Sequence, residues 1–117
     1  MLLAALAAAG APAARAAGDV ALGALQYEAR CGGCHSPDDH RVGPAHRGVF
    51  GRKAGSASGF DYSPALRKSA IVWDEATLDT WLADPDKLIP GQRMNIATAD
   101  AKARRDIGAF LRTLSSR

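Results

Sequence analysis

The two cysteines of the chain lie in one pentapeptide, CGGCH, which runs from Cys31 to His35. Cys31 and Cys34 stand at positions i and i+3, so on a helical turn their thiols share one face. Two thiols placed in this way can form thioethers with the two vinyl groups at one edge of a porphyrin. The histidine that follows directly can reach the iron beneath the ring. The C-x-x-C-H spacing therefore indicates covalent haem attachment.

Three other uses of a cysteine pair compete with this interpretation. A structural zinc site needs about four protein ligands, and His40 and His46 are the only further histidines. A thioredoxin-like dithiol is typical of a βαβ setting, and no strand is predicted before Cys31. A plain disulfide, common in exported chains, leaves His35 without a role. The pattern favours haem over all three.

The sixth iron ligand separates electron transfer from the binding of small molecules. Met94 is the only methionine after Met1. It follows a Pro-Gly turn and is far from the cysteines in sequence. A lone methionine also serves as core packing, and spacing alone leaves both interpretations of Met94 open.

The first seventeen residues are typical of a signal peptide. Residues 1–9 form an apolar run without a preceding Lys or Arg, and Ala14 and Ala16 give an A-x-A-like cleavage site. The run is shorter than the roughly 20 apolar residues of a membrane anchor. We therefore expect a signal peptide over 1–17, a mature domain over 18–117, no membrane span after cleavage, and a periplasmic bacterial protein.

Length and charge exclude other classes of protein. A chain of 117 residues leaves room for one compact domain. Its formal net charge is +3, and no run of basic residues exceeds two neighbours, so the sequence does not indicate nucleic-acid binding. Only 6% of the residues are aromatic, which makes a thin core that a large prosthetic group would complete.

Helices at both ends of the domain, with long loops between them, are predicted to position these residues. Asp19 is a suitable N-cap for a first helix that leads into the cysteines. The glycines and prolines of residues 36–69 indicate loops and turns. Asp74 caps a second helix that ends at Pro85, and a last amphipathic helix begins near Asp100. The expected fold class is all-α.

Several motifs share their order and spacing with a known family. They are Gly23 with Tyr27, CGGCH, Gly43-Pro44, GVFGRKAG at 48–55, Gly59-Phe60, Tyr62, Trp73, the Pro-Gly-x-x-Met turn at 90–94, and Ile107 with Phe110. Through them the sequence from Gly18 onward resembles the class I cytochromes c, close to mitochondrial cytochrome c and bacterial cytochrome c2. The resemblance implies a cytochrome c fold, with crossing N- and C-terminal helices and long loops wrapped around one haem c, attached covalently through Cys31 and Cys34.

The resemblance also implies roles for individual residues. His35 and Met94 would be the axial iron ligands, and the Pro44 carbonyl would accept a hydrogen bond from the far nitrogen of His35. Gly23 would let the first helix cross closely over the last. Hydrogen bonds or charge at a buried haem propionate would come from Arg52, Tyr62 and Trp73.

Some positions depart from the residues usual in the family. His46 stands where an aliphatic side chain is usual, and we expect it to be hydrogen-bonded or partly exposed. Leu66 and Trp81 replace an Asn and a Tyr that donate hydrogen bonds beside the methionine sulfur, and Gln92 replaces a Thr. The loop from His35 to Pro44 is shorter than in the mitochondrial proteins. These changes imply an altered reduction potential.

The expected function is the transfer of single electrons, without enzyme activity. A histidine and a methionine close the iron, and the methionine raises the reduction potential. Redox proteins would dock transiently on a monomer at the haem edge. The candidate rim charges are Arg30, Lys53, Lys87 and Arg93. The alternative, a haem subunit or a peroxidase-like enzyme, requires that Met94 be labile or absent as a ligand, and a gas-binding cytochrome would need an open sixth site.

Overall fold

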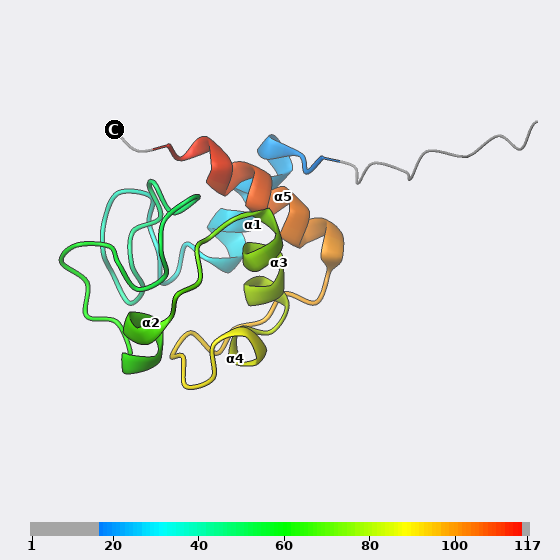
Figure 1. Ribbon diagram of the computed structural model, residues 1–117. Coiled ribbons are helices and arrows are strands. Elements are labelled where there is room, and N and C mark those ends of the chain that lie inside the picture. Colours follow the sequence, from blue (N-terminus) through cyan, green and yellow to red (C-terminus); the bar gives the residue numbers. More distant parts are fainter. Residues whose placement is uncertain (1–16, 116–117) are drawn as a thin grey trace, which may run out of the picture.

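The structure is a computed structural model that describes residues 17–115, so nearly all of the predicted signal peptide lies outside the described residues. In chain order, this part of the chain forms α1 (Val20–Arg30), α2 (Pro64–Lys68), α3 (Glu75–Ala83), α4 (Pro85–Leu88) and α5 (Ala101–Thr113) (Figure 1). Residues 17–115 contain no strand, only an isolated antiparallel bridge between Lys53 and Val72. The predicted all-α fold is confirmed. No helix of the described part is long and apolar enough to cross a membrane.

Helix α1 begins where its cap predicts and ends at the cysteine motif. The Asp19 carboxylate accepts a 2.9 Å hydrogen bond from the Leu22 N–H, which satisfies a free donor of the first turn. At the other end, the Cys31 N–H donates to the Tyr27 carbonyl at 2.8 Å. The His35 N–H then donates to the Cys31 carbonyl at 2.8 Å. The haem-attachment motif therefore continues the helix as a hydrogen-bonded turn.

Helix α3 also begins at its predicted cap. The Asp74 carboxylate accepts from the Thr77 N–H at 2.8 Å, and the Thr77 hydroxyl oxygen accepts from the Asp74 N–H at 2.8 Å, which makes a capping box. The helix ends at Ala83, before Pro85, as predicted. Asp84 then caps a further short helix, α4, with Pro85 in its first turn.

One short helix was not predicted. The expectation of loops throughout residues 36–69 is wrong at Pro64–Lys68, which forms α2. The Ser63 hydroxyl caps it by accepting from the Leu66 N–H at 3.2 Å, and proline is favoured in a first helical turn. The rest of the segment from α1 to α2 is irregular and covers one side of the molecule (Figure 1).

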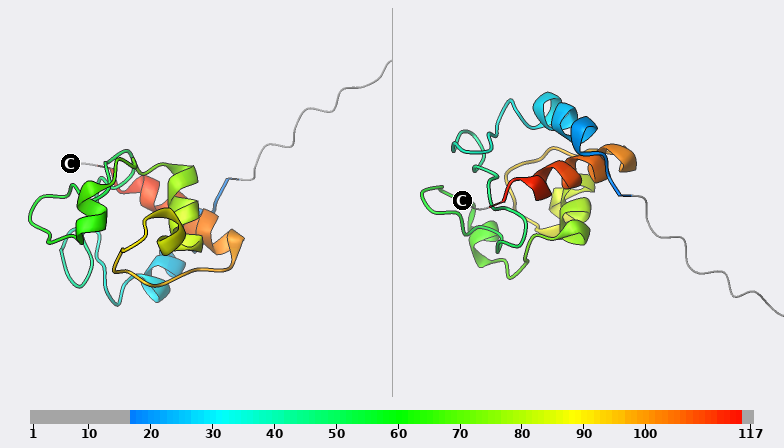
Figure 2. Two further views of the ribbon diagram at one scale, coloured as in Figure 1. Left: turned by 60° about the horizontal axis from the view of Figure 1, so that its bottom comes forward. Right: turned by 90° about the horizontal axis from the view of Figure 1, so that it is seen from above.

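Helices α1 and α5 cross in close contact, as the resemblance implies (Figure 2). A Cβ on Gly23 would lie only 1.9 Å from the backbone oxygen of Asp106, so this approach requires glycine. The Asp19 N–H donates to the Asp106 carboxylate at 2.8 Å. The rings of Tyr27 and Phe110 also pack together, with centroids 5.0 Å apart. The close backbone packing at Gly23, the hydrogen bond to Asp106 and the contact of the two rings therefore hold the helices together where they cross.

Candidate functional site

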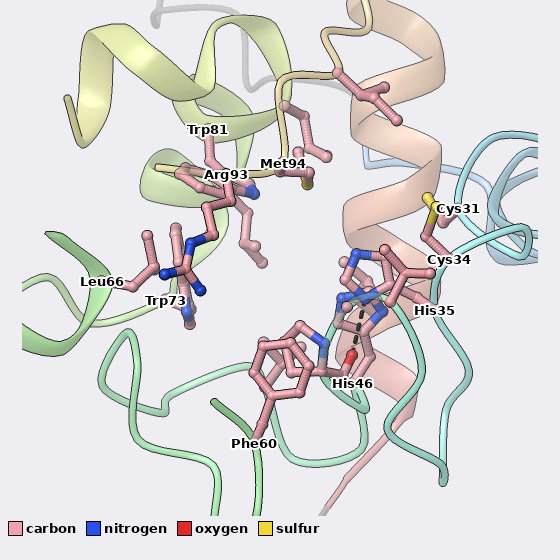
Figure 3. A pocket seen from close by; sticks show the side chains of 18 of the residues that line it. Cys31, Cys34, His35, His46, Phe60, Leu66, Trp73, Trp81, Arg93 and Met94 are labelled. Carbon is pink, nitrogen blue, oxygen red and sulfur yellow. Dashed lines mark hydrogen bonds between the residues drawn. The ribbon is translucent and has the colours of Figure 1, made fainter. Parts of the chain in front are cut away.

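A cavity of about 260 Å³ lies between the crossing helices and the loops (Figure 3). Its wall contains all eight predicted site residues, which are Cys31, Cys34, His35, Pro44, Arg52, Tyr62, Trp73 and Met94. Apolar side chains from separate elements complete the wall, among them Val49, Leu66, Leu78, Leu82, Ile107 and Leu111. The core of the protein is thus arranged around this cavity.

The two cysteines lie close to His35 at one edge of the cavity (Figure 3). Both are half-buried, and they are not joined by a disulfide. Burial raises the pKa of the Cys31 thiol to about 11, against a smaller opposing effect of Arg30. Within residues 17–115 no group of three or more His, Cys, Asp or Glu side chains could hold a metal ion. A structural zinc site therefore has no second set of ligands beside these cysteines.

His35 is held in one tautomer by the backbone. Its Nδ1–H donates a 2.8 Å hydrogen bond to the Pro44 carbonyl, since a carbonyl can only accept. Burial lowers the pKa of His35, although the Pro44 bond opposes this shift. The imidazole is therefore neutral at pH 7, and the lone pair of Nε2 remains available to a metal.

The backbone at Gly43 packs directly against this imidazole. A Cβ added there would lie 2.1 Å from Cε1 of His35 and 2.6 Å from both ring nitrogens. The Gly43 N–H also donates to the Cys34 carbonyl at 2.9 Å. Glycine is thus the one residue that lets the loop approach the ring so closely.

Met94 lies across the cavity from His35, on the loop between α4 and α5 (Figure 3). The turn before it needs glycine, because Gly91 has φ +89°. The Gln92 side chain, which is buried, bonds twice to the residue after Met94: its amide donates to Asn95 Oδ1 at 2.7 Å, and its oxygen accepts from the Asn95 N–H at 3.0 Å. The glutamine that replaces the family's threonine therefore braces the methionine loop.

Arg52 provides a test of whether the cavity suits an anionic group. Its Nη1 and Nη2 atoms donate to the carbonyls of Arg47 and Ala45 at 3.2 and 3.3 Å. Its Nε is buried without a hydrogen-bond partner, a costly state for a charged donor. The Tyr62 hydroxyl accepts from the Ala57 N–H at 3.2 Å and keeps its own proton to donate. This side of the cavity therefore fits a group that carries carboxylates, as a haem does.

Trp73 and Trp81 form an aromatic part of the wall beside Leu66 (Figure 3). Their ring centroids are 5.3 Å apart, and Trp73 and Leu66 are buried. The two replacements noted in the sequence, Leu66 and Trp81, thus supply apolar surface where the family has hydrogen-bond donors.

His46 is a site residue whose contacts the sequence did not reveal. Its ring stacks on that of His35, with centroids 4.1 Å apart and planes inclined by 23°. Its Nδ1 is 2.8 Å from the Tyr27 hydroxyl, in agreement with the expected hydrogen-bonded histidine. Burial, and then the neighbouring His35 and Arg52, lower the pKa of His46 to about 3, so the ring is neutral at pH 7.

The four candidate rim charges lie at different places relative to the cavity. Arg30 and Arg93 line it, whereas Lys53 and Lys87 are exposed and lie outside its wall. No sequence motif indicated that Arg41 contacts the cysteine turn. Its guanidinium donates to three carbonyls of the cysteine turn, those of Gly32, Gly33 and His35, at 2.5, 3.2 and 3.3 Å.

Comparison with known proteins gives a consistent result. The family model described as cytochrome c matches residues 20–115. A cytochrome c from Euglena viridis is 41% identical over 100 residues, which cover 83% of this chain and 98% of that protein. A cytochrome c2 from Rhodoplanes tepidamans is 39% identical over 97 residues, 80% of this chain and 90% of that protein. Among solved structures, cytochrome cH from Methylobacterium extorquens is similar with a TM-score of 0.79 and 45% identity, covering 82% of this chain and 99% of that one.

Proposed function

The chain belongs to the cytochrome c family, and we propose that His35 and Met94 are the two residues that would hold its haem iron. The protein is a monohaem class I cytochrome c, an electron carrier whose haem c is attached through Cys31 and Cys34. The haem supplies an iron that accepts and releases one electron. The protein's own residues bind that iron, exclude water from it and set its potential.

The observation that carries the proposal is the pairing of an imidazole and a thioether across one cavity (Figure 3). The Nδ1–H of His35 donates a hydrogen bond to the Pro44 carbonyl, which leaves Nε2 as the atom that would bind iron and makes it a better electron-pair donor. The soft sulfur of Met94 favours the reduced iron and so raises the potential. With both positions taken, no site remains for a substrate.

The remaining wall supports repeated electron exchange. Apolar residues such as Leu78 and Ile107 keep water from the iron, which lowers the reorganisation that accompanies a change of charge. Arg52, with its unpartnered Nε, would bind a haem propionate together with Tyr62 and Trp73. These residues hold an anion in a site that would otherwise disfavour one.

We also infer where the protein works and what it meets. The signal-peptide pattern of residues 1–17 supports export to a bacterial periplasm. Redox proteins would dock briefly on a monomer where the cavity wall reaches the surface, and Arg30, Arg93 and the exposed Val42 belong to that wall. An apolar contact with positive charge near it suits weak, fast and salt-sensitive encounters with an acidic partner surface.

The Met94→Ala variant tests the ligand proposal. It opens a coordination position, so the oxidised protein should lose the near-infrared sulfur-to-iron band and its potential should fall markedly. The reduced variant should bind carbon monoxide and show some peroxidase activity, while the wild type does neither at neutral pH. Optical spectra and a potentiometric titration measure these changes.

Leu88→Ala is the matched control, because it removes a similar side chain from α4, outside the cavity wall. That variant should keep the sulfur band and the potential of the wild type. A Met94→Ala protein with an unchanged spectrum and potential would contradict the proposal. The iron would then have another sixth ligand, and His46 would be the first to test.

A further inference from the structure

Three rings are in contact on the side of the cavity nearest the cysteines. Those of His35 and His46 are stacked, with centroids 4.1 Å apart and planes inclined by 23° (Figure 3). The Tyr27 ring meets His46 edge-on, with centroids 5.5 Å apart and planes inclined by 70°. The Tyr27 hydroxyl is 2.8 Å from His46 Nδ1. A hydrogen bond thus fixes the ring that covers a face of His35.

A hydrogen bond to the ligand alone does not fix the orientation of its ring. The bond from His35 Nδ1 to the Pro44 carbonyl sets the position of one nitrogen, and the Gly43 backbone packs against the ring, but neither contact presents a plane to which the ring must lie parallel. A flat group against the ring face removes this freedom. The His46 imidazole is such a group, because its plane is nearly parallel to that of His35. An aliphatic side chain would present a rounded surface with no preferred plane.

His46 is itself held by the crossing of the two terminal helices. Tyr27 is only 5% exposed, and its ring packs against Phe110 of α5 with centroids 5.0 Å apart. The hydroxyl end of the same side chain bonds to His46. A continuous series of contacts therefore runs from α5 through α1 to the face of His35.

We propose that His46, anchored by Tyr27, is a positioning residue that sets the plane of the His35 imidazole. The inference rests on the proposed function, because it takes His35 as the iron ligand. The plane of an axial imidazole decides which iron orbital it overlaps. In the oxidised protein this overlap governs the pattern of haem methyl proton shifts and the anisotropy of the electron paramagnetic resonance g-values. Those two signals report ligand orientation directly, and loss of stability alone does not change them.

The test compares two substitutions at one position. His46→Leu keeps apolar volume but removes the flat ring, so the order or spread of the haem methyl shifts and the g-values should change. His46→Phe retains a ring that can stack on His35 and should return both signals toward those of the wild type. Leu114→Ala is the control for destabilisation, because Leu114 is buried but is not part of the cavity wall. It should leave both signals unchanged.

Tyr27→Phe gives a second, milder test. It removes the hydroxyl that holds His46 while keeping the ring that packs on Phe110. The signals should shift in the same direction as in His46→Leu, by a smaller amount. If His46→Leu yields no holoprotein, Tyr27→Phe still tests the proposal.

The outcomes separate this inference from the proposed function. A wild type without the near-infrared sulfur band would contradict the histidine–methionine ligation. A wild type with that band, whose methyl shifts and g-values do not move in His46→Leu or Tyr27→Phe, would overturn the role of His46 alone. Equal shifts in His46→Leu and His46→Phe would also overturn it, because the flat ring would then not be the cause.

Discussion

At the scale of single residues, two glycines on the crossing helices have opposite surroundings. A Cβ on Gly23 of α1 would lie 1.9 Å from a backbone oxygen of α5, and backbone cannot rotate away as a flexible side chain can. A Cβ on Gly108 of α5 would have no atom within 4 Å apart from the nearby backbone of its own helix and its two chain neighbours. Only the first glycine is required by a contact.

We therefore expect the two alanine variants to change stability in opposite directions. Gly23→Ala forces the helices apart and should lower the free energy of unfolding by about 3 kcal/mol or more. Gly108→Ala restricts the unfolded chain without a clash and should raise that free energy by up to about 1 kcal/mol. Urea unfolding of the two holoproteins measures both values. Equal losses of unfolding free energy in the two variants would show that the close approach of the helices is not the reason for glycine at position 23.

At the scale of helices, the sequence predicts the elements whose boundaries depend on local chemistry. Asp19 and Asp74 cap their helices as predicted, because a carboxylate that accepts from a first-turn N–H needs no distant partner. The last helix begins next to Asp100, near the predicted start, and Asp100 is its N-cap. Helix α2 is missed because five residues are too short to show a periodic apolar face. Its own signal, Ser63 before Pro64, stands in a segment rich in turn residues.

The site was predictable only where a residue belongs to a motif. The C-x-x-C-H motif leads directly to Cys31 and His35, whereas the ligand role of Met94 was implied only by the family resemblance and stays a prediction. The contact of His46 with Tyr27 depends on how the loop folds back over α1, which no local pattern specifies. The contacts of Arg41 could not be predicted either, because its hydrogen-bond acceptors are backbone carbonyls, which every residue type has.

The contact between α1 and α5 should depend on pH through Asp106. This carboxylate is 4% exposed and accepts from the Lys102 ammonium at 2.7 Å and the Asp19 N–H at 2.8 Å. These bonds, with a smaller effect of Arg105, hold the pKa of Asp106 below its usual range. A depressed native pKa stabilises the fold above the unfolded-state pKa of about 3.9, and this contribution is lost as the pH falls through the native pKa.

Asp106→Asn should therefore be less stable than the wild type at pH 7, and the difference should shrink at pH 3. Asparagine can still accept from the Asp19 N–H but no longer attracts Lys102. Urea unfolding of the two holoproteins across this range gives the comparison. A difference in unfolding free energy that stays constant from pH 7 to pH 3 would show that Asp106 acts without its charge.

At the scale of the whole molecule, the cavity wall is assembled from segments distributed over the domain. It extends in sequence from Tyr27 on α1 to Leu111 on α5 and includes the loops between them. A haem attached at Cys31 and Cys34, at one edge of this cavity, would be contacted from all of these segments. The cofactor would thus be part of the core of the domain rather than a ligand at its surface.

The mass of the native protein tests maturation of the whole chain. We expect a polypeptide that begins at Ala17 or Gly18 and carries one haem, which stays attached through acid-acetone extraction and denaturing electrophoresis. Two thioethers at Cys31 and Cys34 leave no free thiol to react with an alkylating reagent. Intact mass with an uncleaved leader would contradict export, and extractable haem would contradict covalent attachment.

The hydrogen bond between Tyr27 and His46 couples the two positions energetically. Replacing the tyrosine by phenylalanine first strands an imidazole nitrogen, and replacing the histidine first strands a buried hydroxyl. Either single step costs more than the double change, so the two positions are epistatic. The effects of the two substitutions on the free energy of unfolding are therefore not additive.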